Sequence, residues 1–167
     1  MTGPSNVSGP MRIEYFQLID RIIDLDFANL TIRAEAAVPA TSTIFEGHFP
    51  GHPLMPGVLL IEAMAQTSGW LIIARTKFEK MPFLAAVKEA KLRTFVTPGQ
   101  MLTVSSKLVH EGSGFMIADA AITAGGKPIC DASITLRLMP FPSAQFRSSM
   151  EEAAQRLALP MEAVANG

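Results

Sequence analysis

Residues 57–77 read GVLLIEAMAQTSGWLIIARTK, a sustained apolar stretch with few charges. Pro56 stands directly before it, where a helix can begin without losing a hydrogen bond, because the first N–H groups of a helix have no intrahelical acceptor. The pattern predicts one long helix that is apolar on almost every side. Such a helix needs cover from the rest of the chain, so we expect it to form the core.

Strands are expected on both sides of this helix. Two short β-rich segments flank the turn FAN before it and predict a hairpin. Four longer segments follow it, separated by the turn sequences TPGQ, EGSG and AGGK. The predicted strands cover residues 21–26, 30–38, 83–93, 101–110, 114–123 and 127–139. The sequence therefore predicts an α+β fold in which a curled antiparallel sheet of about five to seven strands surrounds the helix.

Three other segments carry different signals. Residues 14–22 have mixed apolar spacing and predict a short helix, whereas residues 41–56 are rich in turn residues and predict a loop. A final helix is expected at residues 148–159, because Ser148 and Glu151 have the spacing of a capping box and a proline follows the segment.

Length and composition indicate a single folded domain. A chain of 167 residues can bury one core. We expect residues 1–10, rich in Gly, Pro and Ser, to be mobile, residues 11–140 to form the domain, and residues 141–167 to form a C-terminal extension. At 49% hydrophobic and 17% charged residues the chain is apolar for a small monomer, which predicts a buried subunit interface.

Charge and cysteine content limit the partners and the compartment. A formal net charge of -1 provides no overall field for nucleic acid or anionic membranes, so a charged partner would need a local patch. The single Cys130 allows no disulfide framework, and no signal peptide is recognised at the N-terminus. Both features favour the cytoplasm.

A membrane-spanning helix is an alternative interpretation of residues 57–74, whose length could cross much of a bilayer. Glu62 and Gln66 lie inside this stretch, and the strand-rich remainder needs a core to pack on. A buried helix within a folded domain is therefore favoured.

The start of the helix brings together groups that can act in catalysis. Gly57 leaves the first N–H groups accessible at the positive end of the helix dipole, which suits a carbonyl oxygen that gains negative charge. Glu62 lies about 7 to 8 Å further along the axis and is expected in the interior, where an unpaired carboxyl group is protonated and can act as an acid. Gln66, four residues further, can orient it. His48, in the preceding loop, can act as a base.

These groups also have structural interpretations. A lone histidine before a helix is more often structural than catalytic. A metal site with His48, His52 and Glu62 is a further alternative, but Pro50 and Pro53 prevent a helical pair of histidines, and no further histidine or cysteine cluster supplies ligands. We therefore expect no metal.

Residues 47–69, GHFPGHPLMPGVLLIEAMAQTSG, resemble the signature of the β-hydroxyacyl-(acyl carrier protein) dehydratases of bacterial fatty acid synthesis. Residues 90–100, AKLRTFVTPGQ, are also similar to this family, so the resemblance covers roughly residues 12–139. It implies the hotdog fold, in which a sheet wraps a long helix. It also implies a homodimer, with a trimer of dimers as a larger assembly.

The resemblance implies a role for each residue at the helix start. His48 would be the base and Glu62 the acid that remove water from a (3R)-3-hydroxyacyl thioester to give a trans-2-enoyl thioester. The N–H of Gly57 would polarise the thioester carbonyl, and Val58 and Gln66 would also contact the substrate. In the family the histidine and the carboxylate of one site come from opposite subunits, and the acyl chain lies along the dimer interface. No cofactor is implied.

The partner implied by the resemblance is an acyl carrier protein, whose helices are acidic. Lys88, Lys91 and Arg93 form a local basic cluster that could dock it. Ordinary solvated strand charge is an equally good interpretation of these residues.

Both ends of the matched region depart from the common family pattern. MRIEYFQLIDRI stands where ordinary members have a proline-histidine-arginine turn, and an extension follows FPSAQFRSSM. With MPFLAAVKEAKLR and the tail MEAVANG, these features resemble an alphaproteobacterial side branch associated with a dedicated carrier protein and very long hydroxylated acyl chains of lipid A.

Two other function classes stay open at this point. A hotdog thioesterase would hydrolyse the thioester with a carboxylate and water, and a non-catalytic hotdog module would bind acyl chains. Within the dehydratases, isomerising members typically carry aspartate at the position of Glu62, so the glutamate favours simple dehydration.

Overall fold

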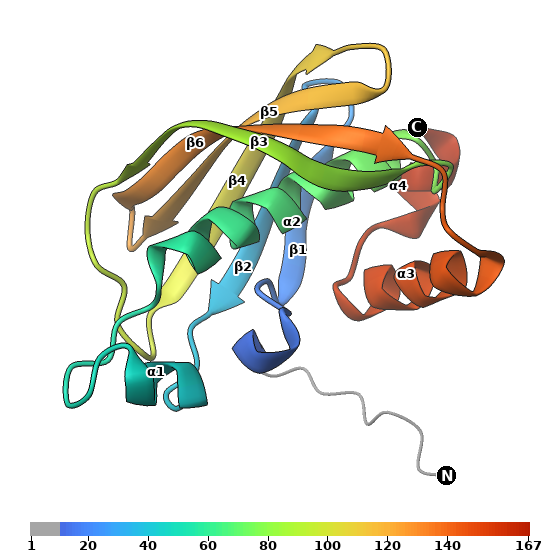
Figure 1. Ribbon diagram of the computed structural model, residues 1–167. Coiled ribbons are helices and arrows are strands. Elements are labelled where there is room, and N and C mark those ends of the chain that lie inside the picture. Colours follow the sequence, from blue (N-terminus) through green and yellow to red (C-terminus); the bar gives the residue numbers. More distant parts are fainter. Residues whose placement is uncertain (1–10) are drawn as a thin grey trace, which may run out of the picture.

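The computed structural model of the chain describes residues 11–167 (Figure 1). The expectation that residues 1–10 are mobile lies outside the described residues. Within the described part, strands and one long helix occupy the centre, and two further helices follow the last strand.

A curled antiparallel sheet wraps around the long helix (Figure 1). Its six strands are β1 (Arg21–Asp26), β2 (Thr31–Ala37), β3 (Met81–Leu92), β4 (Met101–Glu111), β5 (Phe115–Ala124) and β6 (Lys127–Met139). Their order across the sheet is β1-β2-β4-β5-β6-β3, so β1 and β3 form the two edges. The predicted α+β architecture is confirmed, and it is the hotdog fold.

Helix α2 (Gly57–Arg75) is the core of the fold. Pro56 is its N-cap, and the helix ends two residues before the predicted position. Leu71 and Ile72 are fully buried. By length and composition α2 could also cross a membrane, but 72% of its apolar window is buried inside the fold, as expected for the core helix of a globular domain.

Buried hydroxyl groups fasten α2 to the sheet. The Oγ atoms of Ser68 on α2 and Ser106 on β4 lie 2.7 Å apart, and Ser68 also donates to the carbonyl of Met64. Both serines are buried, so this pairing satisfies polar atoms that would otherwise be costly in a dry core. The helix therefore has a fixed position along β4.

The segments before α2 differ in detail from the predictions. A 3₁₀ turn at Ile13–Tyr15 is the only helical structure here, and it overlaps just the first two residues of the predicted helix 14–22. The predicted loop 41–56 contains a short helix, α1 (Thr43–Gly47), whose N-cap Ser42 accepts the N–H of Ile44. A single side-chain cap is enough to close one turn.

The C-terminal extension forms α3 (Ala144–Arg156) and α4 (Met161–Asn166). The predicted start at Ser148 is wrong. Ser143 is the N-cap and accepts the N–H of Phe146 at 3.0 Å, so a hydroxyl without a capping-box glutamate begins the helix. Helix α3 ends at Arg156 with Leu157 as its C-cap, before the predicted end at residue 159, and Pro160 is the N-cap of α4.

Replacing a core side chain should cost far more stability than replacing its exposed neighbour on the same strand. Leu102 on β4 is 0% exposed and Met101 is 54% exposed. We predict that Leu102→Ala lowers the free energy of unfolding by about 2 to 5 kcal/mol, because it leaves a cavity. Met101→Ala should cost less than about 1 kcal/mol. Urea unfolding of both variants measures the difference, and equal losses would contradict the burial pattern.

Candidate active site

The loop before α2 holds the ring of His48 in one orientation. His48 Nδ1 lies 2.9 Å from the carbonyl oxygen of Leu54, and the N–H of Leu54 donates to the carbonyl of His48. A carbonyl can only accept, so Nδ1 carries the proton and the lone pair of Nε2 is free. This tautomer suits a base that acts through Nε2.

The start of α2 is closely packed on one side and open on another. A Cβ atom at Gly57 would lie 2.5 Å from Cδ1 of Leu92, so the glycine accommodates a side chain of β3. Val58 is 71% exposed. The N–H of Gly57 has no hydrogen-bond acceptor within residues 11–167. The predicted unpaired donor is present, and the close neighbour of the glycine is this chain's own Leu92.

A groove of about 490 Å³ runs along one face of α2. Its helix face is built from side chains at helical spacing, namely Glu62, Ala65, Gln66, Gly69, Trp70 and Ile73. The other walls come from residues 11–20, from the start of β3 and from α3. Most of the lining is apolar, and the carboxyl and amide groups of Glu62 and Gln66 converge in it, which is typical of small-molecule sites. Arg12, Asp20 and Arg156 add charged groups to the lining.

The side chain of Gln66 connects the carboxyl group to the N-terminal segment. Its Nε2 donates to the carbonyl of Phe16 at 2.7 Å and to Oε1 of Glu62 at 3.2 Å. Its Oε1 accepts the N–H of Leu18 at 3.3 Å. The prediction that Gln66 reaches the carboxyl of Glu62 is confirmed, and the amide is itself fixed by backbone groups on the opposite wall.

The sequence analysis placed Glu62 in the interior, but the structure does not. Within one chain it is half-buried and faces the groove. The sheet covers the other faces of α2, and this face is bordered by residues 11–20, the first residues of β3, Leu136 of β6 and the C-terminal extension. The apolar residues that flank Glu62 in the sequence therefore pack in the core, while the side chain of Glu62 faces the groove.

A single chain does not bring all predicted site residues into one cavity. Glu62 and Gln66 line the groove, whereas His48, Gly57 and Val58 do not. The expected convergence of base, acid and carbonyl site is therefore absent within one chain. Within the described residues, no group of three His, Cys, Asp or Glu side chains could hold a metal ion.

The predicted basic cluster lies on the open edge of the sheet. Lys88 and Lys91 are exposed on β3, on either side of an irregularity in its pairing with β6. Arg93 follows β3 and pairs with Asp131 at 2.6 Å. The arginine thus has a structural partner, and the two lysines form no ion pair within residues 11–167.

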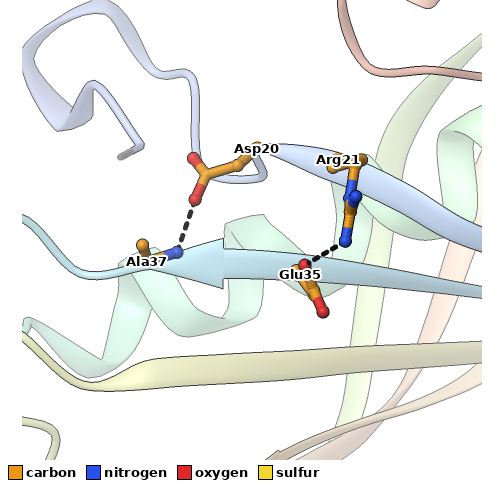
Figure 2. A network of polar contacts seen from close by, with 4 residues as sticks. All are labelled: Asp20, Arg21, Glu35 and Ala37. Atoms are coloured by element: carbon orange, nitrogen blue, oxygen red, sulfur yellow. Dashed lines mark hydrogen bonds and ion pairs between the residues drawn. The ribbon is translucent and has the colours of Figure 1, made fainter. Parts of the chain in front are cut away.

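Asp20 is a groove residue that the sequence analysis did not identify. Figure 2 shows its Oδ2 accepting the N–H of Ala37 at 2.6 Å, beside the ion pair of Arg21 and Glu35. Burial raises the pKa of Asp20 to about 6; the negative charge of Glu35 also raises it, and the N–H of Ala37 lowers it. An aspartate just before a strand gives no sequence signal for this environment.

Helix α3 also lines the groove, although the sequence analysis assigned no role to the extension. Met150, Ala153 and Arg156 of the helix line it, and so does Leu157 directly after the helix. The apolar residues are Met150, Ala153 and Leu157. Their spacing of three and four residues on a predicted helix was a readable signal for one buried face. The sequence alone did not tell which surface that face covers.

Solved structures with little sequence identity share this architecture. The dehydratase heterocomplex ApeI:P from Xenorhabdus doucetiae matches with a TM-score of 0.60 and 17% identity, over 81% of this chain and 89% of that one. A hypothetical thioesterase protein with coenzyme A from Streptococcus pneumoniae matches with a TM-score of 0.55 and 16% identity, over 72% and 85%. Fold and groove thus define a hotdog protein with a carboxyl group in a groove beside its central helix.

Sequence relatives narrow this class. A relative from Fusobacterium nucleatum, named 3-hydroxyacyl-(acyl-carrier-protein) dehydratase FabZ, is 36% identical over 120 residues, covering 72% of this chain and 84% of the relative. A relative of the same name from Clostridium acetobutylicum is 36% identical over 123 residues, covering 73% and 86%. The model of the FabA-like domain matches residues 11–133. The chain belongs to the FabA-like domain family.

Stability should depend on pH through Asp20. Its pKa is about 6 in the fold and 3.8 ordinarily, so the folded chain binds more protons between these values. The contribution of Asp20 is therefore full below pH 3.8 and is lost as the pH rises through about 6. Asp20→Asn stays neutral and keeps an oxygen for Ala37. We predict that it raises the melting temperature relative to wild type more at pH 8 than at about pH 4.5.

Thermal unfolding at both pH values measures this difference. Asp119→Asn, at an exposed position on β5, is the matched control and should show no such dependence on pH. An equal shift for Asp20→Asn at both pH values would contradict the assignment.

Proposed function

We propose that the chain removes water from (3R)-3-hydroxyacyl-(acyl carrier protein) to give trans-2-enoyl-(acyl carrier protein) in fatty acid elongation. The observation that carries the proposal is the carboxyl group of Glu62, oriented by Gln66 in an apolar groove. Relatives covering more than two thirds of the chain carry the name of this dehydratase. The fold alone does not distinguish this activity from a thioesterase, because one fold supports several chemistries.

The proposed step needs one base and one acid. The free Nε2 of His48 takes the proton from C2, and the C2–H electron pair forms the new double bond to C3. The C3–O bond breaks as protonated Glu62 donates its proton to the leaving hydroxyl, which departs as water. One proton is taken and one is given, so no oxidant or cofactor takes part.

The start of α2 is proposed to stabilise the thioester oxygen. Negative charge develops on this oxygen as the C2 proton leaves. The unpaired N–H of Gly57, at the positive end of the dipole of α2, is the group assigned to it. Removal of one such donor typically costs about 3 to 4 kcal/mol of transition-state stabilisation. Exposed Val58 follows directly and is assigned to substrate contact.

A complete site is proposed to require two chains. His48 does not line the groove that holds Glu62, so a second copy would supply the missing group. Strand β3 is an open edge whose exposed side chains include Leu84 and Leu92, at 45% and 52% exposure. Unpaired edges with apolar side chains favour pairing with another strand. We propose a homodimer through this edge, able to assemble as a trimer of dimers.

Within this proposal the remaining assignments follow. Residues 11–140 form the dehydratase domain and residues 141–167 form its extension. The enzyme acts in the cytoplasm on an acyl chain held by an acyl carrier protein. Lys88 and Lys91, with Arg93 beside them, dock the acidic partner on the same edge region. The groove is also compatible with the long hydroxylated chains of the lipid A branch.

Loss of either catalytic group should abolish dehydration. We predict that His48→Ala and Glu62→Gln each lower kcat by about 10²- to 10⁴-fold. Mass spectrometry of 3-hydroxyacyl-(acyl carrier protein) incubated with each protein should show loss of one water with the wild type only. Glu62→Gln retains an oxygen that accepts the hydrogen bond from Gln66, so a loss of activity in this variant is due to the missing acidic proton. Release of free acid by the wild type would indicate a thioesterase, and an unchanged substrate would indicate a binding module.

Mixing the two inactive variants tests the shared site. If each site takes His48 from one chain and Glu62 from the other, a mixed dimer keeps one intact site. Random exchange of subunits should then restore about a quarter of the wild-type activity, since half of the dimers are mixed and half of their sites are intact. Recovery of no activity after verified exchange would place both groups in one chain.

Charge reversal on β3 should weaken carrier docking alone. Lys88→Glu with Lys91→Glu is predicted to raise KM about tenfold for carrier-bound substrate and to spare a pantetheine thioester, because electrostatic attraction acts on the carrier. Exposed Lys127→Glu, at the start of β6, is the matched control. Arg93 is left unchanged because its reversal would also break the ion pair with Asp131. An equal increase in KM for both substrates would contradict the assignment of these lysines to carrier docking.

A further inference from the structure

Helix α3 forms a wall of the groove that contains Glu62. Met150, Ala153 and Leu157 line the groove and are at least partly buried. Gln155 lies on the exposed side of the helix. The helix thus turns the apolar side chains of Met150 and Ala153 toward the groove, and Arg156, its last residue, adds a charged group to the lining.

The wall is fixed to the fold. The N–H of Ile22 on β1 donates to the carbonyl of Leu157 at 2.7 Å. Ala154 is fully buried, and Leu159 and Val164 are each 4% exposed. Burial on this scale, with a hydrogen bond to an edge strand, makes the extension part of the core.

The family match does not account for this wall. The FabA-like domain model ends at residue 133, before α3 begins at Ala144. The carboxyl group and its glutamine lie within the matched region, whereas α3 lies outside it. The groove therefore combines a part that the family shares with a part that the match leaves unexplained.

The position of α3 along the groove indicates what it would contact. The groove extends along α2 from Glu62 to Ile73, about 16 Å at 1.5 Å per residue. Beyond Ile73 the chain turns into β3, whose first residues pair with the end of β6, and α3 follows β6. Figure 1 shows α3 on the side of the C-terminal half of α2, away from α1. The wall is therefore remote from the start of α2.

We propose that Met150 and Ala153 of α3, with Leu157 directly after the helix, form the distal wall of the acyl site and determine which acyl tails the groove accepts. This inference rests on the proposed function, because it takes Glu62 as the position of the reacting carbons. A tail extending from Glu62 away from the helix start passes Gly69 and Pro82, which both line the groove, and reaches the apolar side chains of α3. An alkyl tail is the ligand that such a lining recognises.

A bulky side chain on the wall tests the proposal. Ala153→Phe should fill the distal groove, and Gln155→Phe, on the exposed side of the same helix, is the matched control. Both proteins and the wild type are assayed with 3-hydroxyacyl thioesters of increasing length, beginning with 3-hydroxybutyryl. We expect Ala153→Phe to lower the ratio of kcat/KM for long over short chains at least about tenfold, and Gln155→Phe to keep the wild-type ratio. Equal losses at every length, or the same profile for both variants, would overturn the proposal.

Two further measurements separate this inference from the proposed function. Met150→Ala enlarges the groove without overfilling it and should shift the length profile toward longer chains; an unchanged profile would count against the wall. Displacement of a fluorescent fatty acid reports tail binding without catalysis. Weaker binding of the fatty acid to Ala153→Phe than to Gln155→Phe would support the wall, whether or not the proteins dehydrate the substrate. Absence of dehydration by the wild type would reject only the proposed dehydratase function. Equal binding to both would overturn the wall.

Discussion

An apolar helix that must be covered on every side determines the rest of this structure. The curled sheet covers most faces of α2, and buried Ser68 and Ser106 fix its position against β4. The sheet ends at β3, which has no further strand beside it, so other segments must cover the remaining face of the helix. That face carries Glu62 and Gln66. Because both side chains are polar, the incomplete cover produces a groove with a carboxyl and an amide group in it.

Most of the fold could be predicted from the sequence because its signals are local. Gly- and Pro-rich turns separate the strands, and the long apolar stretch has no competing period. The failures are local as well. Ser148 and Glu151 have capping-box spacing, yet the helix begins at Ser143, since a cap needs only one hydroxyl in the right backbone geometry. The short helix α1 was not predicted because a single helical turn is too short to show a periodic pattern in the sequence.

The candidate site could be predicted only where its parts lie on one helix. Gln66 reaches Glu62 because four residues make one turn. The exposure of Glu62, the distance of His48 from the groove and the environment of Asp20 depend on tertiary contacts. Sequence spacing across a loop containing prolines and glycines does not fix such contacts, and a site shared between chains has no signal in the sequence of one chain beyond a family resemblance.

The groove has walls from both ends of the described chain: the segment before β1, the face of α2 with the start of β3, and α3. The hydrogen bond between Ile22 and Leu157 joins positions near the two ends. Such contacts have a large sequence separation, and the loop-closure entropy they require makes them late events in folding. During synthesis from the ribosome, the sheet and α2 can therefore assemble before the groove has all its walls. The groove is completed only after the last helices have emerged.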